Sequence, residues 1–350
     1  MRSLICSSRR DNSLLIPAAD PAADPAARPR PAARRQRSAR VFALCACLTL
    51  SVGASATRAA DDPSFTRVRD VIVGRAYGTS LTMDVFVPTK QPNGLGVILV
   101  ISGAWISNLD QINPRIKQIV PLTERGYTVF GVLHRSQPRF TLPEMVEDLN
   151  RGVRFIRYNA RKYNIDPDHI GIYGASSGGH LALMQAMAGD LGKKDAKDSI
   201  DRTSSRIQAV AVLRPPTDFL NYGKPGETAL GHGLLKDYAS IFYLLEQPDS
   251  KTKAFVPITD KAKIAEIGRA VSPAHHVTPD DPPTLIIHGA VDKLVPIQQA
   301  EWIAAKLKAV GVEAKVIPKP GIGHGTFPNQ EKDIGVLADW FDTHLKKKAR

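Results

Sequence analysis

The chain has 350 residues, with 47 Lys and Arg against 34 Asp and Glu and a formal net charge of +13 at pH 7. Its first 60 residues hold 10 Arg, no Lys and 3 Asp, so +7 of this charge lies there and +6 remains for residues 61–350. A charge concentrated in an N-terminal segment is not the basic, aromatic-containing surface of a nucleic-acid-binding domain, and we expect no nucleic-acid partner. All three cysteines (Cys6, Cys45, Cys47) lie in the same segment, which excludes disulfides, cysteine metal sites and cysteine nucleophiles from residues 61–350.

Residues 1–60 have the pattern of a leader with a secretory signal peptide. Four arginines between 34 and 40 precede a 12-residue apolar run at 41–52, and small residues follow it. A membrane-spanning anchor needs about 20 apolar residues, so we expect no stable anchor once the leader is cleaved near 57–61. Lipid attachment at Cys45 or Cys47 is an alternative, although few apolar residues precede either cysteine. The sequence therefore predicts an exported protein, periplasmic or secreted.

From residue 61 onward, apolar segments alternate between strand-like and helix-like periodicity. Two alternating segments, 71–73 and 81–87, predict an antiparallel pair of strands. Further strands are expected at 97–101, 127–133, 169–173, 207–213, 284–287 and 314–317. Helices are expected at 113–125, 142–163, 178–188, 298–310 and 331–346. This alternation predicts an α/β fold in 61–350, with a mostly parallel central sheet covered by helices on both faces.

Residues 215–282 do not fit a single strand–helix step and form an insertion between the sixth and seventh of these strands. The insertion holds helix-like segments at 235–245 and 261–270. Its place over the carboxyl edge of the sheet fits either a surface excursion or a cap that shapes a pocket. Tyr238, Phe242 and Tyr243 are candidate pocket residues, and their helical spacing fits simple packing equally well.

The segment Gly174–Gly178 reads Gly-Ala-Ser-Ser-Gly and lies between an expected strand and an expected helix. In that context Gly-x-Ser-x-Gly is a nucleophile elbow, a sharp turn that presents a strained serine at the end of a strand. The alternative is a Gly/Ser turn in which Ser176 or Ser177 only caps the helix. The strand before and the helix after favour Ser176 as a catalytic nucleophile.

A serine nucleophile needs a base and an orienting acid, and behind such an elbow they follow in the order Asp or Glu, then His. Asp292 stands just past the expected strand 284–287, and His324 follows the expected strand 314–317 in a glycine-rich loop. Carboxyl ends of parallel strands meet at one sheet edge, where ligands bind in open α/β sheets. We therefore predict Ser176, Asp292 and His324 as a catalytic triad. Taken separately, Asp292 also fits a helix cap and His324 a loop histidine bonded to backbone.

The transition state of acyl transfer also needs amide donors for its oxyanion. The expected strand 97–101 runs into a turn of small residues at the same sheet edge, followed by Trp105. We predict that the backbone N–H groups of Gly103 and Ala104, with that of Ser177, form this oxyanion hole.

With these motifs, the chain from Asp70 to about Lys347 resembles the α/β-hydrolase carboxylesterases of the hormone-sensitive-lipase-like and feruloyl and acetyl-xylan-esterase-like group. Besides the elbow, the resemblance rests on Ile165–Ile170, His288–Pro296 and Gly323-His324-Gly325. It implies the same roles for Ser176, Asp292 and His324. The oxyanion turn of that group usually reads His-Gly-Gly-x-Trp, whereas Ile101 and Ser102 occupy the first two positions here.

Together these patterns predict a serine hydrolase that cleaves carboxylic esters through an acyl-enzyme. A serine peptidase of the oligopeptidase-related type and a non-catalytic ligand-binding protein on the same fold are the alternatives. The bulk of Ser102, Ala104 and Trp105, and a charged insertion without a long apolar lid, favour small-molecule or carbohydrate-linked esters with short acyl groups. We expect no cofactor and no metal: His275 and His276 lack a third ligand at suitable spacing. The sequence leaves the oligomeric state open.

Overall fold

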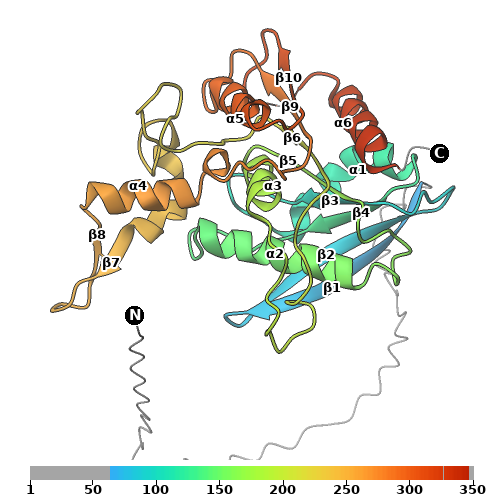
Figure 1. Cartoon of the computed structure of the whole chain (residues 1–350), viewed down its shortest axis with the longest axis horizontal. Helices are drawn as coiled ribbons and strands as arrows, with labels where there is room; N and C mark the ends of the chain where they lie inside the picture. The colour runs from blue at the N-terminus through green and yellow to red at the C-terminus, as the bar shows by residue number, and fades with distance from the viewer. Residues whose placement is uncertain (1–63, 326, 347–350) are drawn as a thin grey trace, which may run out of the picture. The chain divides into compact units, whose positions relative to one another are not determined.

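The computed structural model describes residues 64–325 and 327–346, and the predicted leader with its apolar run at 41–52 lies outside them. An eight-stranded sheet has the strand order β1-β2-β4-β3-β5-β6-β9-β10 (Figure 1). Its strands are β1 (Phe65–Ala76), β2 (Thr79–Pro88), β3 (Gly96–Val100), β4 (Thr128–Val132), β5 (Ile170–Ala175), β6 (Ala209–Leu213), β9 (Thr284–Gly289) and β10 (Ala314–Lys319). The β1–β2 and β2–β4 pairs are antiparallel and the other pairs are parallel. This confirms the predicted α/β fold with its mostly parallel sheet.

The central strands are short and buried on both faces. Every residue of β3, β4 and β6 is buried, which explains why these strands read as continuous apolar runs rather than alternating ones. The registers of the parallel pairs are regular, for example Thr284 opposite Ala314 and Val210 opposite Thr284. Because the strands are aligned, their carboxyl ends form one edge, and the loops that leave this edge lie next to one another.

Helices cover the two faces of the sheet and enclose two separate apolar cores (Figure 1). One core includes buried residues of α2 (Leu142–Tyr158), α3 (Ser177–Ala188) and α5 (Gln298–Ala309). The other includes residues of α1 (Ile116–Thr123) and α6 (Gln330–Leu345). Burying each large apolar side chain contributes about 1.5–3 kcal/mol, so both faces hold the sheet in place. Within the described residues, no helix combines the length and the apolarity needed to cross a membrane.

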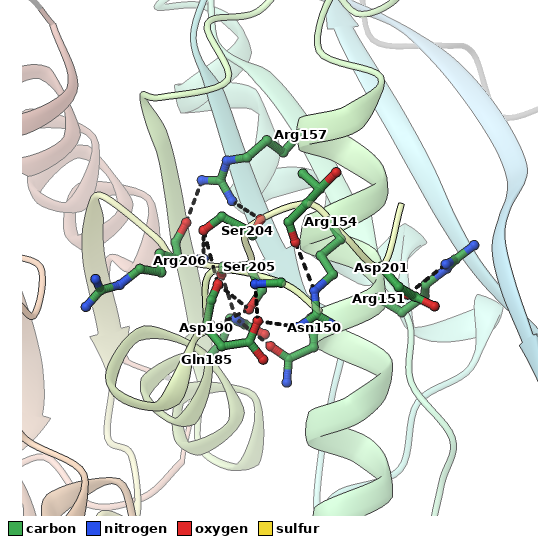
Figure 2. Close-up of polar contacts among 12 residues, drawn as sticks. Asn150, Arg151, Arg154, Arg157, Gln185, Asp190, Asp201, Ser204, Ser205 and Arg206 are labelled. Atoms are coloured by element: carbon green, nitrogen blue, oxygen red, sulfur yellow. Dashed lines mark hydrogen bonds and ion pairs between the residues drawn. The ribbon is translucent and has the colours of Figure 1, made fainter. Parts of the chain in front are cut away.

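The helix α2 is fixed by its cap and by arginines on one face. Thr141 and Glu144 form a capping box at its start. Arg151, Arg154 and Arg157 repeat every three residues, so they lie on the same face of the helix. Figure 2 shows them beside the long connection from α3 to β6. Arg154 bonds Asp190 and the Thr203 carbonyl, Arg157 bonds the Ser204 and Arg206 carbonyls, and Arg151 bonds Asp201. These contacts hold an irregular stretch of backbone against the helix.

The insertion consists of short elements: η3 (Gly233–Leu245), β7 (Glu246–Pro248), β8 (Phe255–Pro257), α4 (Lys261–Ala270) and η4 (Pro273–His275). The expected helix at 235–245 is a 3₁₀ helix, interrupted by non-helical backbone at Leu235, Tyr238 and Phe242. The first and last parts of the insertion 215–282 are joined by hydrogen bonds: Phe219 N donates to Ser272 Oγ at 3.0 Å, and Ala274 N donates to the Thr217 carbonyl at 3.0 Å. Two further 3₁₀ turns, η1 (Leu109–Gln111) and η2 (Asn113–Arg115), follow β3.

Candidate active site

Ser176 occupies the sharp turn between β5 and α3. Its backbone has φ 54° and ψ −121°, a region that residues other than glycine rarely adopt. Glycine is required nearby, because a Cβ at Gly174 would lie 2.4 Å from the Gly178 carbonyl oxygen. The Ser176 side chain makes no capping hydrogen bond to α3. The turn therefore leaves the Ser176 hydroxyl for another partner.

That partner is His324, in the loop after β10. Ser176 Oγ lies 2.9 Å from His324 Nε2, and His324 Nδ1 lies 2.7 Å from Asp292 Oδ2. Each residue follows the carboxyl end of a different strand, β5, β9 or β10. The structure thus brings the three predicted residues into one hydrogen-bonded chain. In this geometry His324 Nε2 can accept the Ser176 proton while Asp292 holds Nδ1–H.

The two oxygens of Asp292 have separate partners. Oδ1 accepts hydrogen bonds from Leu294 N at 3.0 Å and Val295 N at 2.9 Å, which leaves Oδ2 for His324. Burial by itself opposes ionisation, but hydrogen bonding to His288, His324 and the Val295 amide holds the pKa of Asp292 well below its ordinary value. Asp292 is therefore a carboxylate at neutral pH.

The turn after β3 is closed by two reciprocal hydrogen bonds of 2.9 Å between Gly103 and Ile106. Its central residues, Ala104 and Trp105, have φ of 52° and 56°, which costs on the order of 1–3 kcal/mol for each side-chain-bearing residue. Because the Gly103 N–H donates to the Ile106 carbonyl, the structure does not support the prediction of Gly103 as an oxyanion donor. Of the predicted donors, Ala104 N–H has no intramolecular partner in the described part of the chain. Ser177 begins α3, where amides lack intrahelical partners.

His180 connects the elbow helix to this turn and to the insertion, a role that its position in the sequence did not indicate. Its Nδ1 accepts a hydrogen bond from Trp105 Nε1 at 3.3 Å, and its Nε2–H donates to the Val271 carbonyl at 2.9 Å. Burial lowers the pKa of His180 to about 4, so the ring is neutral and both nitrogens keep these partners. The only feature of the sequence that could have pointed to this role was the position of His180, one helical turn after Ser176.

A small cavity of 180 Å³ opens beside Ser176 and His324. Its lining includes Ala104 and Trp105 of the turn after β3, and Leu235 and Tyr238 of the insertion. Pro216, Leu294 and Val295 complete the lining. Tyr238 thus lies where the sequence proposed it, whereas Phe242 is buried in the core and Tyr243 is half exposed. Leu235 was missed, because nothing in its periodicity separates a pocket residue from a core residue.

Within 64–325 and 327–346, no group of three or more His, Cys, Asp or Glu side chains is arranged to hold a metal ion. His275 instead contacts Asp218, with Nε2 and Oδ2 3.1 Å apart.

Known proteins with similar sequences and structures include esterases. A probable isoprenylcysteine alpha-carbonyl methylesterase of Arabidopsis thaliana is 26% identical over 261 residues, which cover 74% of this chain and 52% of that protein. The probable carboxylic ester hydrolase LipM of Mycobacterium tuberculosis is 24% identical over 245 residues, 69% of this chain and 52% of its own. This chain thus spans about half the length of these curated relatives.

A solved structure described as a truncated form of a carbohydrate esterase from gut microbiota superposes with a TM-score of 0.66 and 26% identity. The superposition covers 81% of the present chain and 98% of the carbohydrate esterase chain. The family model of BD-FAE matches residues 83–307, more than half of the chain, including Ser176 and Asp292. The predicted fold and the resemblance are confirmed: the chain belongs to the BD-FAE family of α/β-hydrolase esterases.

Proposed function

We propose that this protein is a serine hydrolase that cleaves carboxylic esters through Ser176, His324 and Asp292. The observation that carries the proposal is the chain of two hydrogen bonds, 2.9 Å and 2.7 Å, that joins the three residues at the carboxyl edge of the sheet. The esterase names of relatives support the reaction class.

In the proposed reaction, Ser176 Oγ attacks the ester carbonyl while His324 Nε2 takes the hydroxyl proton. The Ala104 and Ser177 amides stabilise the tetrahedral oxyanion, with the negative charge on the former carbonyl oxygen. The ester C–O bond then breaks, and His324 returns the proton to the leaving alcohol. Water attacks the acyl-enzyme by the same route and releases the acid and free Ser176. Asp292 keeps His324 in the tautomer that carries the proton on Nδ1 and stabilises the imidazolium.

The size of the site favours short acyl groups. Its cavity of 180 Å³ is below the range of about 300–1,000 Å³ of sites for drug-sized ligands. Leu235 and Tyr238 of the insertion are among the residues that line it. The insertion also exposes charged residues (Lys224, Glu227, Lys236, Asp237), which suit a water-exposed entrance rather than a lipid interface. We infer acetyl-like esters of carbohydrates or small alcohols as the substrate class.

Labelling by a fluorophosphonate tests the proposal directly. Wild-type protein should be labelled at Ser176, and Ser176→Ala should lose most of roughly 10⁶-fold in kcat without unfolding. Because a triad acts as a unit, Ser176→Ala/His324→Ala should be scarcely worse than either single variant. A label on Ser177 or Ser102, or multiplicative losses, would refute these roles. Labelling with turnover of peptides only would favour a peptidase, and no labelling would favour a non-catalytic binder.

We also propose that the protein is exported, from the arginine-flanked apolar run at 41–52. Expressed in a Gram-negative host, it should be recovered from the periplasm or medium with an N-terminus between residues 57 and 61. Recovery from the cytoplasm with the leader intact would contradict this.

A further inference from the structure

Gln137 contacts the two strained residues, Ala104 and Trp105, of the turn Gly103–Ile106, which we call the oxyanion turn. It lies in the segment that follows β4, and this segment runs alongside the turn. The Gln137 side-chain Nε2–H donates to the Ala104 carbonyl, and its backbone N–H donates to the Trp105 carbonyl at 3.3 Å. One residue therefore binds the two carbonyls whose residues have positive φ.

These contacts, together with the Gly103–Ile106 pair, fix the direction of the amides in the turn. In a trans peptide unit the C=O and the N–H point in opposite directions, so a bound carbonyl also orients the N–H of the next residue. The Gly103 carbonyl accepts from Ile106 N, which orients Ala104 N–H, and the Ala104 carbonyl accepts from Gln137, which orients Trp105 N–H. In the described part of the chain, neither of these two N–H groups has an intramolecular hydrogen-bond partner. Ala104 and Trp105 both line the cavity beside Ser176.

The insertion in turn orients the Gln137 side chain. Ser240, on η3, donates its hydroxyl to Gln137 Oε1. A side-chain amide that accepts at Oε1 has its Nε2 on the other side, which here faces the Ala104 carbonyl. The same 3₁₀ helix supplies Leu235 and Tyr238 to the cavity. The element that contributes Leu235 and Tyr238 to the cavity therefore also carries Ser240, which bonds Gln137.

From this geometry we propose that Gln137 is a positioning residue for the oxyanion turn, and that Ser240 holds Gln137 in the required orientation. The inference rests on the proposed ester hydrolysis, and it adds to that reaction a link between the insertion and the oxyanion hole. Gln137 does not touch the reacting atoms. It acts by keeping Ala104 and Trp105 in a backbone conformation that they would otherwise leave.

Gln137→Met tests this, because methionine keeps the length of the side chain and cannot donate to the Ala104 carbonyl. With p-nitrophenyl acetate, we expect kcat to fall about 10- to 100-fold and KM to change less than about 3-fold, since the oxyanion forms only in the transition state. Gln247→Met, the same change on exposed β7, is the matched control and should leave both constants unchanged. A kcat within 2-fold of wild type, or a loss confined to KM, overturns the proposal.

Ser240→Ala supplies a second test that leaves Gln137 in place. It should lower kcat in the same direction but less, and Ser240→Ala/Gln137→Met should equal Gln137→Met alone, because Ser240 acts through Gln137. Additive losses would overturn the link. A crystal structure of Gln137→Met should show altered φ at Ala104 and Trp105, and an unchanged turn would overturn the proposal. Lack of turnover and labelling in the wild-type protein would instead refute the proposed esterase function. The crystal structure of Gln137→Met tests the support of the turn without relying on activity.

Discussion

Leu235→Ala should widen the acyl specificity. Leu235 is almost fully buried, lines the 180 Å³ cavity, and would lose three carbon atoms in this substitution. The space corresponds to roughly three acyl methylenes, each worth about 0.8 kcal/mol when buried, or about fourfold in kcat/KM. For hexanoate relative to butyrate, a difference of two methylenes, the ratio of kcat/KM should rise by about 15-fold. We expect the wild-type protein to be most active on esters with two to four acyl carbons, and Leu235→Ala on esters with five or six.

The measurement is kcat/KM over a series of p-nitrophenyl esters from acetate to octanoate. Leu234→Ala is a close control, because Leu234 is the neighbouring residue, is 44% exposed and does not line the cavity. Since Leu235→Ala opens a cavity, it should also lower the free energy of unfolding by about 2–5 kcal/mol, and thermal melting must show that the variant is folded during the assay. A folded Leu235→Ala with the wild-type chain-length profile, or an equal shift in Leu234→Ala, would refute this account of the pocket.

Three further variants test the acid, the buried histidine and the arginine face of α2. Asp292→Asn should lower kcat by about 10⁴-fold with the fold retained, because asparagine does not hold the same His324 tautomer; steady-state kinetics and circular dichroism check this. His180 takes up a proton near pH 6.5 when unfolded and near pH 4 when folded, so stability is lost as pH falls between these values. The free energy of unfolding, measured in urea, should fall between pH 7 and pH 5 by about 2 kcal/mol less in His180→Gln than in the wild type. An unchanged pH dependence would refute the argument that burial keeps His180 neutral. Arg154→Ala should lower the free energy of unfolding by about 1–3 kcal/mol by leaving the Thr203 carbonyl without its donor, whereas exposed Arg161→Ala should have little effect.

The sheet and the positions of Ser176, Asp292 and His324 were predictable because the sequence patterns that mark them are local. Strand boundaries follow from apolar runs, and β5, for example, begins within one residue of the expected strand. Ser176 is marked by the glycines that its turn requires. Asp292 and His324 needed only the rule that loops after parallel strands share one edge. No side-chain geometry enters any of these steps.

The oxyanion turn was predictable only in part, because its hydrogen bonds are not encoded in a motif. Gly103 satisfies its amide within the turn by bonding Ile106, which depends on positive φ at two residues that are not glycine. Such a conformation persists only when distant groups support it. Here the support comes from residues far away in the chain: Gln137 bonds the turn and is itself bonded by Ser240, 103 residues later, and Trp105 bonds His180, 75 residues later. Periodicity in a single sequence carries no information on such pairs.

In the proposed mechanism, proton transfer and substrate selection therefore depend on different parts of the molecule. Ser176, Asp292 and His324 stand on loops whose positions are set by the register of β5, β9 and β10. Part of the cavity lining, Leu235 and Tyr238, comes from η3, an irregular 3₁₀ segment with three breaks in its helical backbone. Changes in η3 such as Leu235→Ala should alter which acyl groups fit while the 2.9 Å and 2.7 Å contacts of the triad remain. The Ser240–Gln137 contact is the exception, because through it a change in the insertion reaches the turn at Ala104 and Trp105 and should lower the rate for every ester alike.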